Sequence, residues 1–133
     1  MVIMSSFNFE KFYDVGNHLR SYSNSEEYQR SSATRYYYSV FNSVKDYYET
    51  SFRKHLPSTD SHGTLIRELE NSPFRKENEL GEKLRILRNN RNHADYFKRK
   101  FRLNKVNSSK KKSEEVFSLL DQLSKNPLRL MKK

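Results

Sequence analysis

The chain has 133 residues, enough for a single domain over residues 1–133, and its lack of Cys excludes disulfides, thiolate zinc sites and cysteine nucleophiles. Lys and Arg outnumber Asp and Glu by 26 to 16, and the formal net charge of +10 favours a polyanionic partner, with nucleic acid the commonest. No basic segment precedes an apolar run at the N-terminus, and no stretch suits a membrane span, so we expect a soluble, cytoplasmic protein that does not act at a membrane.

Two helices are predicted in the first half of the chain. Residues 8–22 place apolar side chains at helical spacing, and the SNSEE segment that follows offers a capping residue before two acids, as helix N-termini prefer. A longer helix is predicted over residues 26–56, where Pro57 would stop it. Its expected core face follows the i, i+3, i+4, i+7 spacing and consists of Ala33, Tyr37, Val40, Phe41, Val44, Tyr48 and Ser51.

Three more helices are predicted in the second half. A short one is expected over residues 64–70, a long one over 77–102 and a last one over 113–125. The basic RLNKVNSSKKK segment between the last two is predicted to be a flexible connection, and residues 126–133 a frayed tail. Since nothing alternates as a strand would, we expect an all-α antiparallel bundle of four to five helices, ordered from about residue 8 to residue 125.

The long helix predicted over residues 77–102 has two faces of different character. At 100° per residue, one sector holds the apolar side chains of Leu80, Leu84, Leu87 and Ala94 and is predicted to be the core face. Another sector carries two guanidiniums, two amides, an imidazole and a phenol, from Arg85, Arg88, Asn89, Asn92, His93 and Tyr96.

This polar sector suggests a restricted chemistry. Arg88 offers a planar set of donors suited to phosphate, His93 can exchange protons near neutral pH, and Asn89 can orient either of them. No carboxylate pair or His-x-x-x-His spacing accompanies them, so we expect no metal and no other cofactor. A proton-transfer group beside a phosphate clamp suits transesterification by an RNA 2′-hydroxyl, whereas a solvated helical surface is the simpler alternative.

Within that sector, RNNRNH resembles the R-x4-6-H signature of HEPN domains. Arg88 takes the Arg position, Asn89 the polar residue that follows it, and His93 the His position. LRILRNNRNHADYF resembles the penultimate long helix of the family, and SSATRYYYSVFNSVKDYYE its aromatic-rich second helix. The resemblance spans about residues 9–125.

The resemblance implies a bundle that usually dimerises and pairs its two motifs, and many such proteins are metal-independent ribonucleases of toxin, phage-defence or RNA-processing systems. It gives His93 the proton transfer, Arg88 the stabilisation of phosphate charge and Asn89 the geometry. One subfamily pairs with a nucleotidyltransferase antitoxin that modifies a Tyr in an R-x4-H-x-Y pattern. Tyr96 lies one residue later here, so it is only a possible modification site.

Basic residues continue beyond the motif, with eight between Lys98 and Lys112 and no acid among them. They are consistent with a solvated charged loop or with a track for an RNA backbone. The predicted RNA contacts are Arg85, Asn92, Lys98, Arg99, Lys110, Lys111 and Lys112. His18, His55 and His62 are predicted to be surface residues, and Arg91 and Asp95 a structural i, i+4 ion pair.

The function predicted from the sequence is therefore a metal-independent endoribonuclease, homodimeric and a toxin or defence effector. Two alternatives remain open. One is a non-catalytic HEPN module that binds RNA or docks a partner, and the other is a substrate of a nucleotidyltransferase antitoxin.

Overall fold

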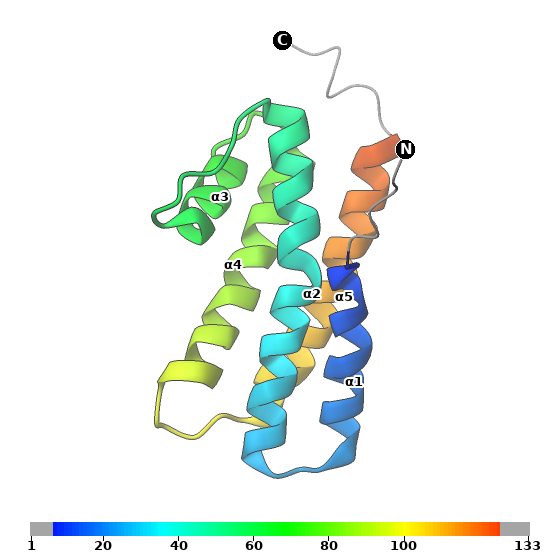
Figure 1. The fold of residues 1–133 in the computed structure, drawn as a ribbon, viewed down its shortest axis with the longest axis vertical. Helices are drawn as coiled ribbons and strands as arrows, with labels where there is room; N and C mark the ends of the chain where they lie inside the picture. Colours follow the sequence, from blue (N-terminus) through cyan, green and yellow to red (C-terminus); the bar gives the residue numbers. More distant parts are fainter. Residues whose placement is uncertain (1–6, 126–133) are drawn as a thin grey trace.

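The computed structural model describes residues 7–125. After a short 3-10 helix (η1, Phe9–Lys11), five α-helices follow and no strand occurs in this part of the chain, so the predicted all-α bundle is confirmed. Their bounds are α1 Phe12–Tyr22, α2 Glu26–Phe52, α3 Ser61–Glu70, α4 Arg75–Tyr96 and α5 Leu103–Lys125. The long α2 packs against α1, α4 and α5, and the short α3 lies beside the first half of α4 (Figure 1). No helix among the described residues is long and apolar enough to cross a membrane.

The core is built around α2. Six of the seven side chains predicted for its core face are buried, and Ser51 is half-buried. Tyr36 is fully buried as well, because α2 is covered on several sides and needs an apolar face wider than one stripe. Its ring fits against Gly16 of α1, where a Cβ atom would lie 2.8 Å from Tyr36 Cε1. The Ser32 hydroxyl donates to the Gly16 carbonyl at 2.7 Å, so the two helices approach closely at this point.

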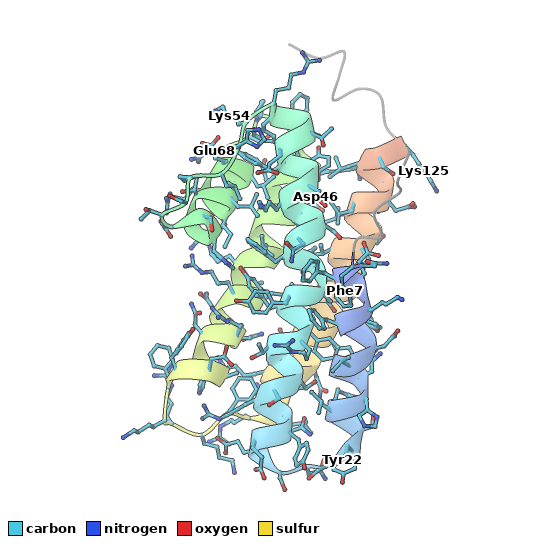
Figure 2. All side chains as sticks on the ribbon, in the orientation of Figure 1. Phe7, Tyr22, Asp46, Lys54, Glu68 and Lys125 are labelled. Carbon is cyan, nitrogen blue, oxygen red and sulfur yellow. The ribbon has the colours of Figure 1, made fainter. Side chains whose placement is uncertain are left out.

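Two helix ends differ from the prediction. The second helix ends at Phe52, before Pro57 is reached, because Arg53 adopts a left-handed conformation with φ of 56°. A Lys54–Glu68 ion pair of 3.3 Å joins the segment after α2 to α3 (Figure 2). The helix predicted to run to residue 102 ends at Tyr96, because Phe97 is extended, with φ −108° and ψ 136°.

The prediction that the basic RLNKVNSSKKK segment is a flexible connection is also wrong. From Leu103 onward it is part of α5, which begins ten residues earlier than predicted. Val106, Ser109, Ser113 and Val116 form a continuous buried stripe, and its two serines conceal the helical periodicity in the sequence. The helix predicted over residues 64–70 begins earlier as well, at residue 61, and the predicted tail 126–133 lies outside the described residues.

Candidate functional site

Four of the predicted site residues meet in a cleft between α3 and α4, the cleft of Arg88. Its volume is about 230 Å³. From α3 come Gly63, Ile66 and Arg67, and from α4 come Arg85, Arg88, Asn89 and Asn92. The predicted core face of α4 (Leu80, Leu84, Leu87 and Ala94) is buried on the other side of the helix, which turns these polar residues toward α3.

The guanidiniums of this cleft differ in how fully they are neutralised. Arg85 binds Glu70 through two nitrogens, at 2.7 and 2.8 Å, and Arg67 binds Asp60 at 3.1 Å. Arg88 lies 3.9 Å from Asp60 and makes no hydrogen bond to any described residue. Hydrogen bonds from Arg85 and Arg67 lower the pKa of Glu70 and Asp60, so both acids are charged at neutral pH. Three guanidiniums against two carboxylates leave one positive charge in excess, carried by Arg88.

Amide groups complete the polar lining. Asn89 is exposed, and Asn92 is half-buried with its Oδ1 accepting from Arg91 at 3.3 Å. The amide nitrogens of both residues are therefore available as donors beside the Arg88 guanidinium. Donors without matching acceptors, together with an excess positive charge, suit a phosphate group.

His93 does not lie on this polar face, and that prediction is wrong. His93 follows Arg88 by five residues, and at about 100° per residue its side chain points about 140° away from that of Arg88 around the helix axis. The ring is only 5% exposed and packs edge-on against Phe101, with ring centres 5.1 Å apart. Its Nε2 lies 3.1 Å from the Arg99 carbonyl, which can only accept, so Nε2 carries the hydrogen. Nδ1 is buried and has no partner among the described residues.

The segment that covers His93 is tied to α2 by one side chain, and we call these contacts the Arg30 latch. Arg30 Nη2 donates to the Arg99 carbonyl at 2.7 Å, the same oxygen that His93 contacts. Arg30 Nη1 donates to three further carbonyls at 2.7–3.2 Å, those of His93, Ala94 and Phe97. On its other side Arg30 pairs with Glu26 at 2.9 Å, and Glu26 also accepts from the Phe101 amide. The latch supplies partners for the last carbonyls of α4 and so explains where that helix ends.

The remaining predicted residues are divided between two parts of the molecule. Lys98 and Arg99 are exposed on the connection between α4 and α5, next to Tyr96, which is 67% exposed and whose hydroxyl accepts from Arg91 at 3.2 Å. The three α5 lysines do not join the cleft of Arg88. Lys110 contacts the Tyr13 hydroxyl of α1 at 3.0 Å and Glu114, Lys112 pairs with Glu115 at 3.2 Å, and Lys111 is exposed.

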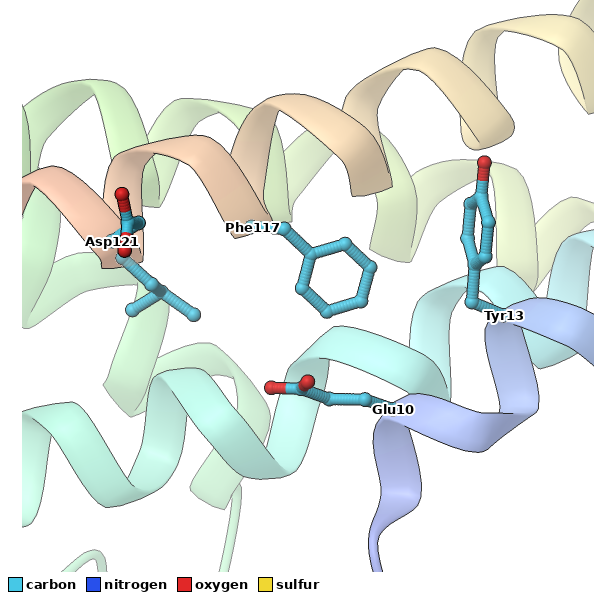
Figure 3. Close-up of a pocket in the computed structure, with 5 residues that line it drawn as sticks. Glu10, Tyr13, Phe117 and Asp121 are labelled. Atoms are coloured by element: carbon cyan, nitrogen blue, oxygen red, sulfur yellow. The ribbon is translucent and has the colours of Figure 1, made fainter.

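A second cavity, of about 520 Å³, lies between η1, α1 and the end of α5 (Figure 3). Its lining combines the side chains of Tyr13, Phe117 and Leu120 with the carboxylates of Glu10 and Asp121. It does not suit a phosphate, because two carboxylates would repel the anion.

His62 is the residue at this site that the sequence analysis missed. It stands in the first turn of α3, half-buried, and its ring stacks on Phe41 with centres 4.0 Å apart and planes 9° apart. Its Nδ1 is hydrogen-bonded to the buried Tyr37 hydroxyl. Burial lowers the pKa of His62, and the charges of Arg88 and Arg91 lower it further. No local pattern reveals this position, because only the folding of the α2–α3 connection brings His62 back onto α2.

The comparisons with known proteins agree with the architecture. The model of the HEPN domain matches residues 18–123. No curated protein and no solved structure matches the chain.

Proposed function

The chain belongs to the HEPN domain family, which includes ribonucleases of toxin and defence systems, and we propose that it is a metal-independent endoribonuclease. The observation that carries the proposal is the cleft of Arg88, where an incompletely neutralised guanidinium lies beside two amides. Such a cleft binds the phosphodiester of an RNA and stabilises the charge that builds on it during the reaction. The net charge of +10 favours the encounter with RNA.

In the proposed reaction, Arg88 holds the non-bridging oxygens of the scissile phosphate, and Asn89 donates a hydrogen bond that keeps the phosphate in place. The RNA 2′-oxygen attacks phosphorus, and the bond to the 5′-oxygen breaks. The products are a 2′,3′-cyclic phosphate and a 5′-hydroxyl. Arg85, Asn92, Lys98 and Arg99 contribute contacts to the RNA beside the reacting bond.

His93 is proposed to transfer a proton in this reaction. Because Nε2 is held by the Arg99 carbonyl, the nitrogen left for chemistry is Nδ1. That nitrogen reaches a substrate only when the segment covering it moves, on binding of RNA or of a second copy of the chain. This requirement also favours a second candidate function, a HEPN module that binds RNA without cleaving it.

We propose that the active form is a homodimer that pairs two clefts, and that the protein is a toxin or defence effector held in check by an antitoxin partner. The exposed Tyr96 hydroxyl is a candidate for modification by a nucleotidyltransferase partner. Light scattering at tens of micromolar should show a dimer. A stable monomer at that concentration contradicts the paired-cleft arrangement.

The deciding experiment is a gel assay of the purified chain on mixed RNA in the presence of EDTA. Cleavage should persist in the chelator and leave 2′,3′-cyclic phosphate ends, and a 2′-methoxy group at the cut site should block it. Arg88→Ala should slow cleavage by about 10²–10³-fold, the effect of losing one electrostatic stabiliser. Arg75→Ala is the matched control, because Arg75 is on the same helix and 93% exposed.

Each outcome separates the two candidate functions. Binding that needs Arg88 but produces no cleavage supports the non-catalytic module. Cleavage that a chelator abolishes, or that Arg88→Ala leaves at the wild-type rate, contradicts the proposed mechanism.

A further inference from the structure

His62 stands at the edge of the cleft of Arg88. The next residue, Gly63, lines the cleft. Asp60, two residues before His62, lies 3.9 Å from the Arg88 guanidinium. Burial has the largest effect on the pKa of both members of the hydrogen-bonded pair, lowering that of His62 and raising that of Tyr37, and the positive charge of Arg88 acts on both as well. The imidazole and the candidate phosphate-binding guanidinium therefore share one site.

The His62 ring is held in one orientation. One face stacks on Phe41 of α2, the Tyr38 ring lies nearly perpendicular to it at a centre-to-centre distance of 6.3 Å, and Nδ1 is bonded to the Tyr37 hydroxyl. Nε2 has no hydrogen-bond partner among the described residues. A ring with one nitrogen fixed by a buried phenol and the other unoccupied is arranged as catalytic histidines are.

The groups around His62 keep it neutral. Burial lowers its pKa, and so do the positive charges of Arg88 and Arg91 on α4, while Asp60 on its own helix opposes them. Tyr37 on α2 is itself uncharged, because burial raises the pKa of its phenol. This hydrogen bond allows two tautomers of the ring, and the one in which Nδ1–H donates to the Tyr37 oxygen leaves a lone pair on Nε2 that can accept a proton.

We propose that His62 is the general base of the RNA cleavage reaction and takes the 2′-hydroxyl proton on Nε2. The inference rests on the proposed ribonuclease function and deepens it, since transesterification needs one group to remove a proton and another to supply one. As the bond from O2′ to phosphorus forms, the bond from phosphorus to O5′ breaks. The departing 5′-oxygen takes its proton from protonated His93. His62 ends protonated and His93 neutral, and exchange with water restores both.

The first test replaces the ring while keeping its bond to Tyr37. In His62→Asn, the amide reproduces a hydrogen-bonding group near the Nδ1 position but leaves nothing at Nε2. Cleavage should fall by about 10²–10⁴-fold while RNA affinity is retained. In His62→Ala, added imidazole should restore part of the lost rate, which a purely structural histidine would not allow. His55→Asn is the control, because the His55 side chain is 93% exposed at the other end of the α2–α3 connection. A wild-type rate in His62→Asn overturns the inference.

The second test leaves His62 in place and changes a charge beside it. Removing the positive charge in Arg91→Gln should raise the pKa of His62, so the acidic limb of the cleavage rate should move to higher pH. An acidic limb that does not move overturns the inference even if His62 variants fail to fold.

The third test separates the base from the acid. RNA with sulfur in place of the 5′-oxygen at the cut site has a leaving group that needs no proton. This substrate should restore cleavage to His93→Asn but not to His62→Asn, and the reverse pattern overturns the assignment. A wild-type protein that cuts no RNA at all defeats the proposed function, whereas cleavage that ignores His62 defeats only this inference.

Discussion

Replacing Arg30 tests whether the latch holds the end of α4 in place. Arg30→Ala removes four hydrogen bonds to carbonyl groups, one of them to the oxygen that also anchors His93. At a net contribution of about 0.5–1.5 kcal/mol each, the free energy of unfolding should fall by about 2–6 kcal/mol. For a chain of this size the melting temperature drops by about 3–5 °C per kcal/mol, so a decrease of at least about 6 °C is expected.

The matched control is Arg35→Ala on the same helix. The Arg35 guanidinium lies 4.7 Å from the centre of the Phe12 ring and makes no hydrogen bond to a described residue, so its loss should cost about 1 kcal/mol or less. Arg30→Lys keeps the charge but cannot span the same carbonyls, and it should resemble the alanine variant.

Hydrogen exchange and nitrogen NMR supply readouts that are specific to the latch. In Arg30→Ala, the amides of residues 97–101 should exchange faster than they do in the wild type, whereas the exchange of the amides of α1 should change less. The His93 ring should carry its hydrogen on Nε2 in the wild type and lose that preference in the variant. An unfolding free energy within 0.5 kcal/mol of the wild type (about the size of an ordinary surface substitution), or unchanged exchange in this segment, refutes the latch.

Three more predictions follow from the packing and the charges. Gly16→Ala should destabilise the protein in a thermal melt, because overpacking against the buried Tyr36 ring costs about 1–3 kcal/mol and the gain in helix propensity is only about 1 kcal/mol; a higher melting temperature contradicts this. The hydrogen bond from Arg85 lowers the pKa of Glu70 in the folded state, so the ionised carboxylate stabilises the fold at pH values above the ordinary pKa of 4.5, and this stability is lost as the pH falls below 4.5. The free energy of unfolding of Glu70→Gln should therefore decrease less on acidification than that of the wild type. Lys111→Gln should leave the salt dependence of RNA binding unchanged, since α5 contributes nothing to the cleft, and a smaller slope would show that RNA extends over α5.

Helical periodicity was sufficient to predict the main core. Val40 and Val44 on α2, and Leu80 and Leu84 on α4, are apolar residues at regular spacing, and they are buried as predicted. The start of α5 was missed because its buried stripe contains serines. Ser109 satisfies its hydroxyl locally, by donating to the Lys105 carbonyl. Apolar periodicity does not reveal a core position whose polar group is satisfied within its own helix.

The site could be predicted only in part, since its details depend on contacts between distant segments. Arg88 and Asn89 face the cleft because they lie opposite the core face of their own helix, which the sequence shows. His93 is buried because Arg30, more than sixty residues away, ends α4 and folds the next segment over the ring. The position of His62 likewise depends on its packing against Phe41 and Tyr37. Neither contact has a signature in local sequence.

The acidic cavity of Figure 3 and the cleft of Arg88 differ in the charge of the side chains that line them. Glu10 and Asp121 lie between α1 and α5, whereas the excess positive charge of Arg88 lies between α3 and α4, on the other side of α2 (Figure 1). A polyanion that approaches in dilute salt is therefore repelled by the Glu10 carboxylate and attracted by the Arg88 guanidinium, while Asp121 is paired with Lys125 at 3.2 Å. Electrostatic attraction of this kind raises the association rate rather than slowing release, and added salt screens it at separations beyond one Debye length, about 10 Å at 0.1 M.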